Sequence, residues 1–192
     1  MTAVIVLAVI AAVLLLWIIG AYNALITLKN RVLNAWKQID VQLKRRHDLI
    51  PNLVNTVKGA MDFERGTLDA VISARARAVA ATTVKETARA EGELTQALGR
   101  LFALTEAYPE LKTNQNILAL QEELTSTENR VGFARQAYND LATDYNTRQS
   151  TFPTVLVAGL AKATPAELWE IEDATERAVP KVDLSFGSTP RS

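Results

Sequence analysis

Residues 43–59 read LKRRHDLIPNLVNTVKG, and the path of the chain through this stretch determines the topology of the fold. Five charged or titratable side chains occupy positions 44–48, and Pro51 follows within a segment that otherwise has the composition of a helix. A proline inside a helix removes one backbone hydrogen bond and its ring clashes with the preceding turn. In the first turn of a helix a proline is well tolerated. The helix therefore either ends before Pro51 or bends there and continues.

Both alternatives have support in the sequence. Asp48 is a suitable N-cap for a new helix, which favours a chain reversal. The apolar residues on both sides of the proline instead keep one helical phase, in steps of three, four or seven: Trp36, Ile39, Leu43, Ile50, Val54 and Val57. A loop that reversed the chain would have no reason to preserve that phase. We therefore predict a kinked, near-continuous helix with a basic joint on its outer side, made of Lys44, Arg45, Arg46, Asp48 and Pro51.

Upstream lies an uninterrupted apolar segment, AVIVLAVIAAVLLLWII at residues 3–19. Its length approaches the ~20 residues that a helix needs to cross a ~30 Å hydrocarbon core. The alternatives are a buried core helix and a cleaved signal peptide, but no basic residue precedes the segment, and it is longer than the usual apolar region of about 7–15 residues. We expect a retained transmembrane helix over residues 1–22, with anchoring residues that include Val4, Leu7, Leu14, Trp17, Ile19 and Tyr22.

The basic residues after the span indicate its orientation. Lys29, Arg31 and Lys37 follow it closely, so the positive-inside rule places the short N-terminus outside and the C-terminal part in the cytoplasm, at the cell membrane. Lys44 is 24 residues beyond Gly20, or roughly 36 Å along a helix, which is several Debye lengths of ~8 Å. We expect positions 44–46 to form a solvated helix face; the alternative is a contact with an acidic neighbouring copy.

The rest of the chain predicts further helices. Thr83 and Glu86 have the spacing of a capping box, and Tyr108 before Pro109 marks a helix end. A helix over 113–151 carries an apolar seam in steps of three and four, at positions 117, 120, 124, 127, 131, 134, 138, 141, 145, 148 and 152. Thr164 is the expected N-cap of a short C-terminal helix.

The predicted fold is all-α. Glycine and proline are few, 8 and 6 residues, and no alternating β-type stretch competes with the helical pattern. A transmembrane helix should continue into an elongated antiparallel bundle of long helices, followed by the short C-terminal helix. The expected organisation is an anchor over 1–22, a stalk helix over 23–47, a helical bundle over 48–178 and a flexible tail over 179–192.

Composition excludes several kinds of chemistry. The chain has no cysteine and His47 is its only histidine, so disulfides, thiolate catalysis and Cys/His zinc sites are excluded. The net charge is zero, but residues 29–58 carry seven Lys/Arg against two Asp, a balance of +5. The balance over residues 59–192 is therefore −5, from fourteen basic and nineteen acidic residues. A neutral or acidic globular part argues against nucleic-acid binding, and we predict no cofactor and no metal.

Four polar residues lie on or beside the apolar seams: Glu64, Arg75, Glu128 and Arg135. They could form a carboxylate site for acid–base chemistry. Interhelical ion pairs that fix register are the simpler interpretation, because no nucleophile, metal-ligand set or phosphate loop accompanies them.

Several stretches in this order closely resemble the LemA family of bacterial membrane proteins: YNALITLKNRVLNAWKQIDVQLKRRHDLIPNLVNTVKG at 22–59, EAYPELK at 106–112, TENRVGFARQAYND at 127–140 and TFP at 151–153. The resemblance implies one N-terminal transmembrane helix and a soluble helical bundle, but no activity. Some members are encoded beside a membrane metallopeptidase or a TPM-domain protein, which are therefore candidate partners. His47 departs from the family, which more often has tyrosine there, and Leu168-Trp169 stands where phenylalanines are usual.

The sequence thus predicts a non-enzymatic, membrane-anchored scaffold that contacts membrane lipid and forms homo-oligomers. Two alternatives remain: a hydrolase or protease-associated regulator that uses the Glu and Arg residues of the bundle, and a membrane-shaping protein. A cavity lined by Glu64, Arg75 and Glu128 would favour an enzyme, and a symmetric interface would favour a scaffold.

Overall fold

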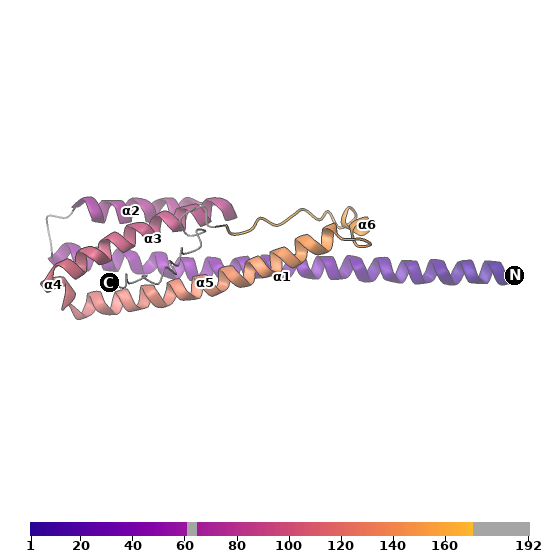
Figure 1. The fold of residues 1–192 in the computed structure, drawn as a ribbon, viewed down its shortest axis with the longest axis horizontal. Helices are drawn as coiled ribbons and strands as arrows, with labels where there is room; N and C mark the ends of the chain where they lie inside the picture. The colour runs from indigo at the N-terminus through magenta and orange to yellow at the C-terminus, as the bar shows by residue number, and fades with distance from the viewer. Residues whose placement is uncertain (61–64, 171–192) are drawn as a thin grey trace, which may run out of the picture.

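The computed structural model describes residues 1–60 and 65–170, and within those ranges all regular secondary structure is helical. The longest element is α1, Thr2–Ala60, a single helix of 59 residues. At 1.5 Å per residue α1 is roughly 88 Å long, and its N-terminal part projects alone beyond the rest of the molecule (Figure 1). Pro51 lies inside α1. The predicted near-continuous helix is therefore confirmed, and the chain does not reverse at the proline.

The remaining helices pack along the C-terminal part of α1. The hairpin of α2 (Arg65–Ala80) and α3 (Val84–Ala107) is followed by one short turn, α4 (Pro109–Lys112), and by α5 (Gln115–Ser150), which runs back along α1. The last element, α6 (Val155–Ala158), lies beside α1 at the end of the bundle that faces the projecting segment (Figure 1). The all-α prediction is confirmed.

The start of α3 has the capping box that the sequence predicts. Thr83 Oγ1 accepts a hydrogen bond from the Glu86 N–H at 3.2 Å, and Glu86 Oε2 accepts from the Thr83 N–H at 3.2 Å. Thr82 donates to the same carboxylate through its backbone and its hydroxyl. These bonds favour the ionised form and hold the pKa of Glu86 below its ordinary value. At the other end, Tyr108 has extended dihedrals before Pro109 and terminates α3 as expected.

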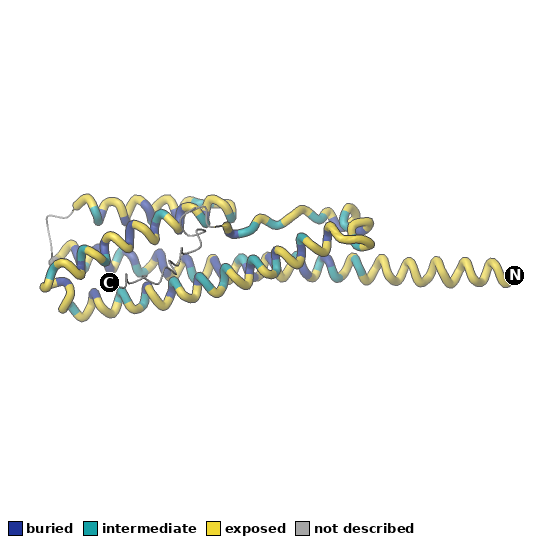
Figure 2. Tube along the Cα trace, in the orientation of Figure 1, coloured by how far each residue is buried: buried dark blue, intermediate teal, exposed yellow. Residues whose placement is uncertain are grey.

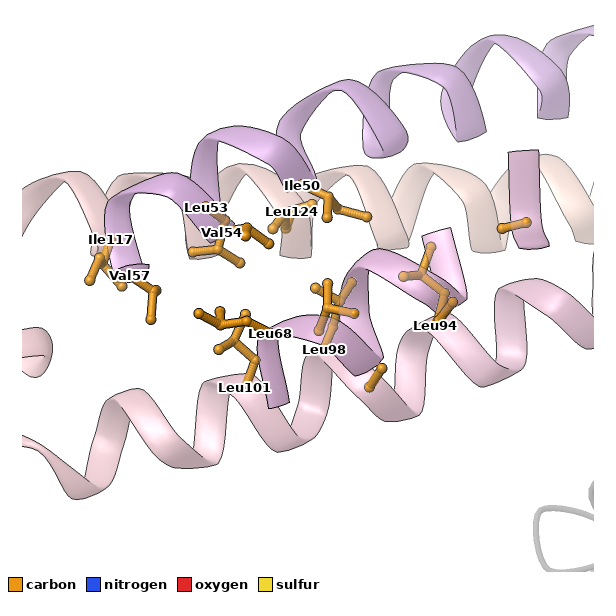
Figure 3. Close-up of a cluster of buried hydrophobic side chains, with 14 of the residues drawn as sticks. Ile50, Leu53, Val54, Val57, Leu68, Leu94, Leu98, Leu101, Ile117 and Leu124 are labelled. Carbon is orange, nitrogen blue, oxygen red and sulfur yellow. The ribbon is translucent and has the colours of Figure 1, made fainter. Parts of the chain in front are cut away.

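Two buried clusters hold the bundle together (Figure 2). The distal core, remote from the projecting segment, gathers side chains from the end of α1, the α2–α3 hairpin and the start of α5 (Figure 3). Its main members are Ile50, Leu53, Val54, Val57, Leu68, Leu94, Leu98, Leu101, Ile117 and Leu124. The proximal core joins the middle of α1 to the end of α5 through Leu25, Leu28, Val32, Ile39, Leu43, Val131, Tyr138, Ala142 and Tyr145.

Residues 23–47, which were expected to form a stalk, contribute one wall of the proximal core. Their apolar side is buried against α5 from Leu25 onward, because α5 is long enough to run beside them. The Trp36 ring of α1 and the Tyr138 ring of α5 have their centres 5.5 Å apart, so these two residues stand at the same height along the bundle. The bundle therefore begins almost at the end of the apolar segment.

The predicted seam of α5 is correct over most of its length and drifts at its end. Ile117, Leu124, Thr127, Val131, Tyr138 and Tyr145 are buried as expected. After Tyr138 the buried positions move on by one, to Ala142 and Gln149 instead of 141 and 148. A straight α-helix has 3.6 residues per turn and departs from a strict 3.5 repeat in this direction. Phe152, the last predicted seam residue, lies beyond the end of α5 at Ser150 and is exposed.

Residues 163–170, here called the strap, form an extended segment where the sequence predicted a helix beginning at Thr164. Asparagine side chains of α5 hold its backbone. Asn146 accepts from the Ala166 N–H at 2.8 Å and donates to the Ala166 carbonyl at 2.9 Å, and Asn139 does the same for Trp169 at 2.8 and 3.0 Å. These bonds use the backbone groups that a helix would need for itself, so the segment stays extended. The predicted tail, 179–192, lies outside the described residues.

Candidate functional site, a buried ion network beside Pro51

Arg46 is the centre of an ion network inside the bundle. Its side chain and that of Glu91 on α3 are each only 4% exposed, and Arg46 Nη1 donates to Glu91 Oε2 at 2.7 Å. Arg46 Nη2 donates to Thr95 Oγ1 at 2.9 Å. It also lies 2.8 Å from Glu128 Oε2 on α5, a close ion pair without the alignment of a hydrogen bond. One arginine therefore ties α1 to both α3 and α5.

His47 extends the network from the next position of α1. Its Nε2 lies 2.6 Å from Glu91 Oε1, so each oxygen of this carboxylate has its own partner. An ionised carboxylate only accepts hydrogen bonds, which assigns the hydrogen to Nε2. Satisfying both oxygens is what makes a buried carboxylate tolerable, because a buried charge that loses its partner costs roughly 3–5 kcal/mol.

Arg75 on α2 repairs the defect that Pro51 makes in α1. In an α-helix the N–H of residue 51 would donate to the carbonyl of residue 47, and proline has no N–H. The His47 carbonyl accepts instead from Arg75 Nε at 2.7 Å. A carbonyl left unpaired at such a site costs about 1–3 kcal/mol. The docking of α2 on α1 therefore supplies a bond that α1 cannot make for itself.

A cleft of about 480 Å³ opens beside the network, between α1 and the α2–α3 hairpin. Charged side chains line it with mixed sign: Asp40, Asp48, Lys44 and Arg75, together with His47. Its two hydroxyls, Thr82 and Thr87, already donate to Glu86 and to the Thr83 carbonyl. Since Glu91 occupies His47 Nε2, the described residues of the cleft provide no nucleophile hydrogen-bonded to a base. What the network does is connect α1 with α2, α3 and α5.

The basic joint is only partly the solvated face that the sequence predicted. Lys44 is exposed, and Arg45, half exposed, pairs with Glu123 of α5 at 2.6 Å. The expectation is wrong for Arg46, which continues the three-and-four spacing of Leu43 and Ile50 and therefore points into the bundle. Asp48 is exposed in the interior of α1 and caps no helix.

The four predicted polar residues have different environments. Glu128 joins an interhelical ion pair as expected, although with Arg46. Arg75 bonds to the α1 backbone, and its expected neighbour Glu64 lies outside the described residues. Among the described residues Arg135 makes a cation–π contact in place of the expected ion pair, with its guanidinium 5.6 Å from the centre of the Trp169 ring of the strap.

Three partners in the network were not predicted: Glu91, Thr95 and Glu123. A signal for Glu91 was present, since it stands three and seven residues before Leu94 and Leu98, within the buried stripe of α3. A carboxylate in such a stripe requires a buried cation, and Arg46 is the matching charge in the stripe of α1. Thr95 and Glu123 are partly or fully exposed, and sequence spacing gives no comparable signal for them.

The projecting segment of α1 is long and apolar enough to cross a membrane, and it is the single helix of this kind in the described part of the chain. The residues expected to anchor it are exposed: Val4, Leu7, Leu14, Trp17, Ile19 and Tyr22. Among the basic residues that follow, Arg31 and Lys37 are exposed and Lys29 is half-buried beside the proximal core. These features are compatible with a single-pass membrane anchor.

Comparison with known proteins identifies the chain. The model of the LemA family matches residues 35–184. The protein LemA of Metamycoplasma hominis is 28% identical over 142 residues, which are 73% of this chain and 64% of that protein. The match thus spans less than two thirds of the length of that relative. Since the family match covers well over half of the 192 residues, the chain belongs to the LemA family.

Proposed function

We propose that this protein is a single-pass membrane anchor carrying a rigid helical bundle that acts as a non-enzymatic scaffold. The observation that supports this most is the continuity of α1. One helix contains the apolar segment and the main wall of both cores, and the first fully buried side chain, Leu25, follows Tyr22 within one turn. Without a linker between span and bundle, the bundle keeps a fixed distance and direction from the bilayer.

The ion network supports the same function. Arg46, His47 and Arg75 connect α1 to the other long helices at the level where Pro51 weakens it. The side chains of Arg46, His47 and Glu91 are engaged in these contacts and with one another, which supports a structural use of these charges. The alternative of a hydrolase built on Arg75 and Glu128 gains little support, because Arg75 lines the cleft and Glu128 does not. The membrane-shaping alternative has no specific observation in its favour.

The proposed orientation places the bundle in the cytoplasm. Arg31 and Lys37 are exposed on the bundle side of the span, where anionic lipid of the inner leaflet attracts basic residues. The proposed partners are membrane lipid, further copies of the same chain, and through the family a membrane metallopeptidase or a TPM-domain protein.

Self-association follows from tethering, because copies confined to one membrane meet at a high effective concentration. Exposed basic residues of the region 29–58, which has a balance of +5, among them Lys37 and Lys44, would attract the acidic region 59–192 of a staggered neighbour. Mass photometry of the full-length protein in mild detergent and in nanodiscs tests this. We expect particles with several copies that dissociate at high salt, when charges are screened.

Charge reversal provides a matched control. Lys37→Glu with Lys44→Glu should lower the copy number, whereas Arg100→Glu, an exposed site on α3 in the distal part, should not. Single-copy particles of the wild type in both detergent and nanodiscs would refute self-association.

A further inference from the structure

The segment between α5 and the strap carries large apolar side chains that the bundle does not cover. Phe152, Leu156 and Leu160 are 78%, 67% and 71% exposed, and Val155 is also exposed. Val157 and Ala161 face the opposite way and are buried. The segment is thus amphipathic, with one side packed on the bundle and the other side apolar and free. A cluster of this kind on a water-exposed surface marks an interaction site.

The position of this segment indicates what covers it. Ala158 and Ala161 belong to the proximal core, which begins on α1 at Leu25, three residues after the apolar segment ends at Tyr22. In Figure 1, α6 lies at the end of the bundle from which the span projects. A helix that crosses the hydrocarbon core over residues 3–22 leaves roughly 5–7 Å of headgroup region on each side, or about three to five further residues. The α6 segment therefore lies at the level of the lipid headgroups.

The charges around the segment fit the same position. No charged residue occurs in positions 149–161, thirteen residues in a chain that is 22% charged. Arg148 and Lys162 stand at the two ends of this interval, and both are exposed. Basic residues that flank an apolar segment are suited to contact lipid phosphates while the apolar residues enter the boundary between headgroups and acyl chains.

We propose that residues 152–160 are a second membrane contact, a foot that inserts Phe152, Leu156 and Leu160 into the lipid interface beside the span. The partner is the bilayer surface itself, and the inference rests on the proposed membrane anchor. With two contacts, the span and the foot, the bundle would resist tilting away from the foot side, because tilting would pull these apolar side chains out of the lipid interface.

The absence of cysteine in the chain makes a direct test simple. Full-length Phe152→Cys and Leu156→Cys variants would be spin-labelled, placed in nanodiscs of phosphatidylcholine and phosphatidylglycerol, and probed by collision with oxygen and with a water-soluble nickel chelate. Phe133→Cys is the matched control, because Phe133 is 74% exposed on α5 but level with the middle of the bundle. Leu14→Cys reports on the span.

We expect labels at 152 and 156 to show an oxygen-to-nickel accessibility ratio at least threefold above that at 133. Equal ratios at 152, 156 and 133 would overturn the foot, and so would low accessibility to both probes, which indicates a protein cover. A lipid-like label at position 14 in the same sample shows that such a failure concerns the foot alone. A water-like label at position 14 would overturn the anchor and the foot together.

Discussion

At the scale of single residues, two adjacent arginines of α1 occupy opposite environments. Arg46 is buried against Glu91 and Glu128, whereas the side chain of Arg45 remains 50% exposed in its pair with Glu123. Removing Arg46 leaves the Glu91 carboxylate buried without its arginine partner, and losing one partner of a buried ion pair costs roughly 3–5 kcal/mol. An exposed pair contributes about 0–1 kcal/mol.

We therefore expect Arg46→Met to lower the free energy of unfolding by several kcal/mol and Arg45→Met by less than about 1 kcal/mol. Urea unfolding of the full-length protein in detergent, followed by circular dichroism, measures both. The assignment fails if the two variants unfold at the same midpoint. Glu91→Gln should resemble Arg46→Met, since it removes the same buried charge pair.

The link between Pro51 and Arg75 predicts a coupling between two substitutions. Arg75→Met should destabilise the wild type by about 1–3 kcal/mol, because the His47 carbonyl loses its donor. In a Pro51→Ala background the new N–H can donate to that carbonyl, so the same substitution should cost less. A double-mutant cycle measures the difference. Strictly additive effects would contradict it, and Arg77→Met, at an exposed pair with Glu93, is the control.

At the scale of elements, the cap of α3 gives a pH dependence of known sign. Backbone hydrogen bonds from Thr82 and Thr83 lower the pKa of Glu86 from its ordinary 4.5. A lowered pKa in the folded state adds stability above the unfolded pKa, and this is lost as the pH falls through the folded value. Glu86→Gln keeps an acceptor but does not titrate. Between pH 7 and pH 3 the wild type should therefore lose more stability than this variant, and parallel curves would exclude the effect.

The strap offers a second test at this scale. Asn146→Ala removes both bonds to the Ala166 backbone, so the strap should detach more often. Lys162, exposed just before it, is the reporter, because trypsin should then cleave there several times faster. Asn129→Ala, at an exposed position of the same helix, should leave the rate unchanged. Equal cleavage rates in all three proteins would show that the asparagines do not hold the strap.

Local signals predicted the elements well and their tertiary partners poorly. The capping box at Thr83, the end of α3 at Tyr108 and the continuity through Pro51 each depend on neighbouring residues or on one periodic pattern, which a sequence displays directly. The strap depends on asparagines that are distant in the chain from the backbone they bind. The capping pattern at Thr164 predicts a helix, but it cannot reveal that these asparagines bind the backbone groups which that helix would need. Arg46 shows the same limit, since its burial requires Glu91 of another helix.

At the scale of the whole molecule, the proposed topology predicts where each end of the chain lies. A reporter enzyme fused after Ser192 should be active in the cytoplasm, because the positive-inside rule retains Lys29, Arg31 and Lys37 there. The protein should also remain in the membrane fraction after carbonate extraction. A fusion to a phosphatase that is active only outside the cytoplasm should be silent. Activity of that fusion would reverse the orientation, and recovery of the protein in the carbonate wash would exclude the anchor.

The unbroken course of α1 from apolar segment to bundle makes length and direction inseparable. Each residue of an α-helix adds about 1.5 Å of rise and about 100° of rotation. One alanine inserted between the span and Leu25 would therefore raise the bundle only slightly, but would turn it by more than a quarter of a revolution relative to the span. The face of the bundle that stands above a given face of the span is thus an azimuth set by counting residues. In two proteins whose insertions differ by one residue, spans that pack against the same neighbour in the membrane would direct different faces of their bundles toward it.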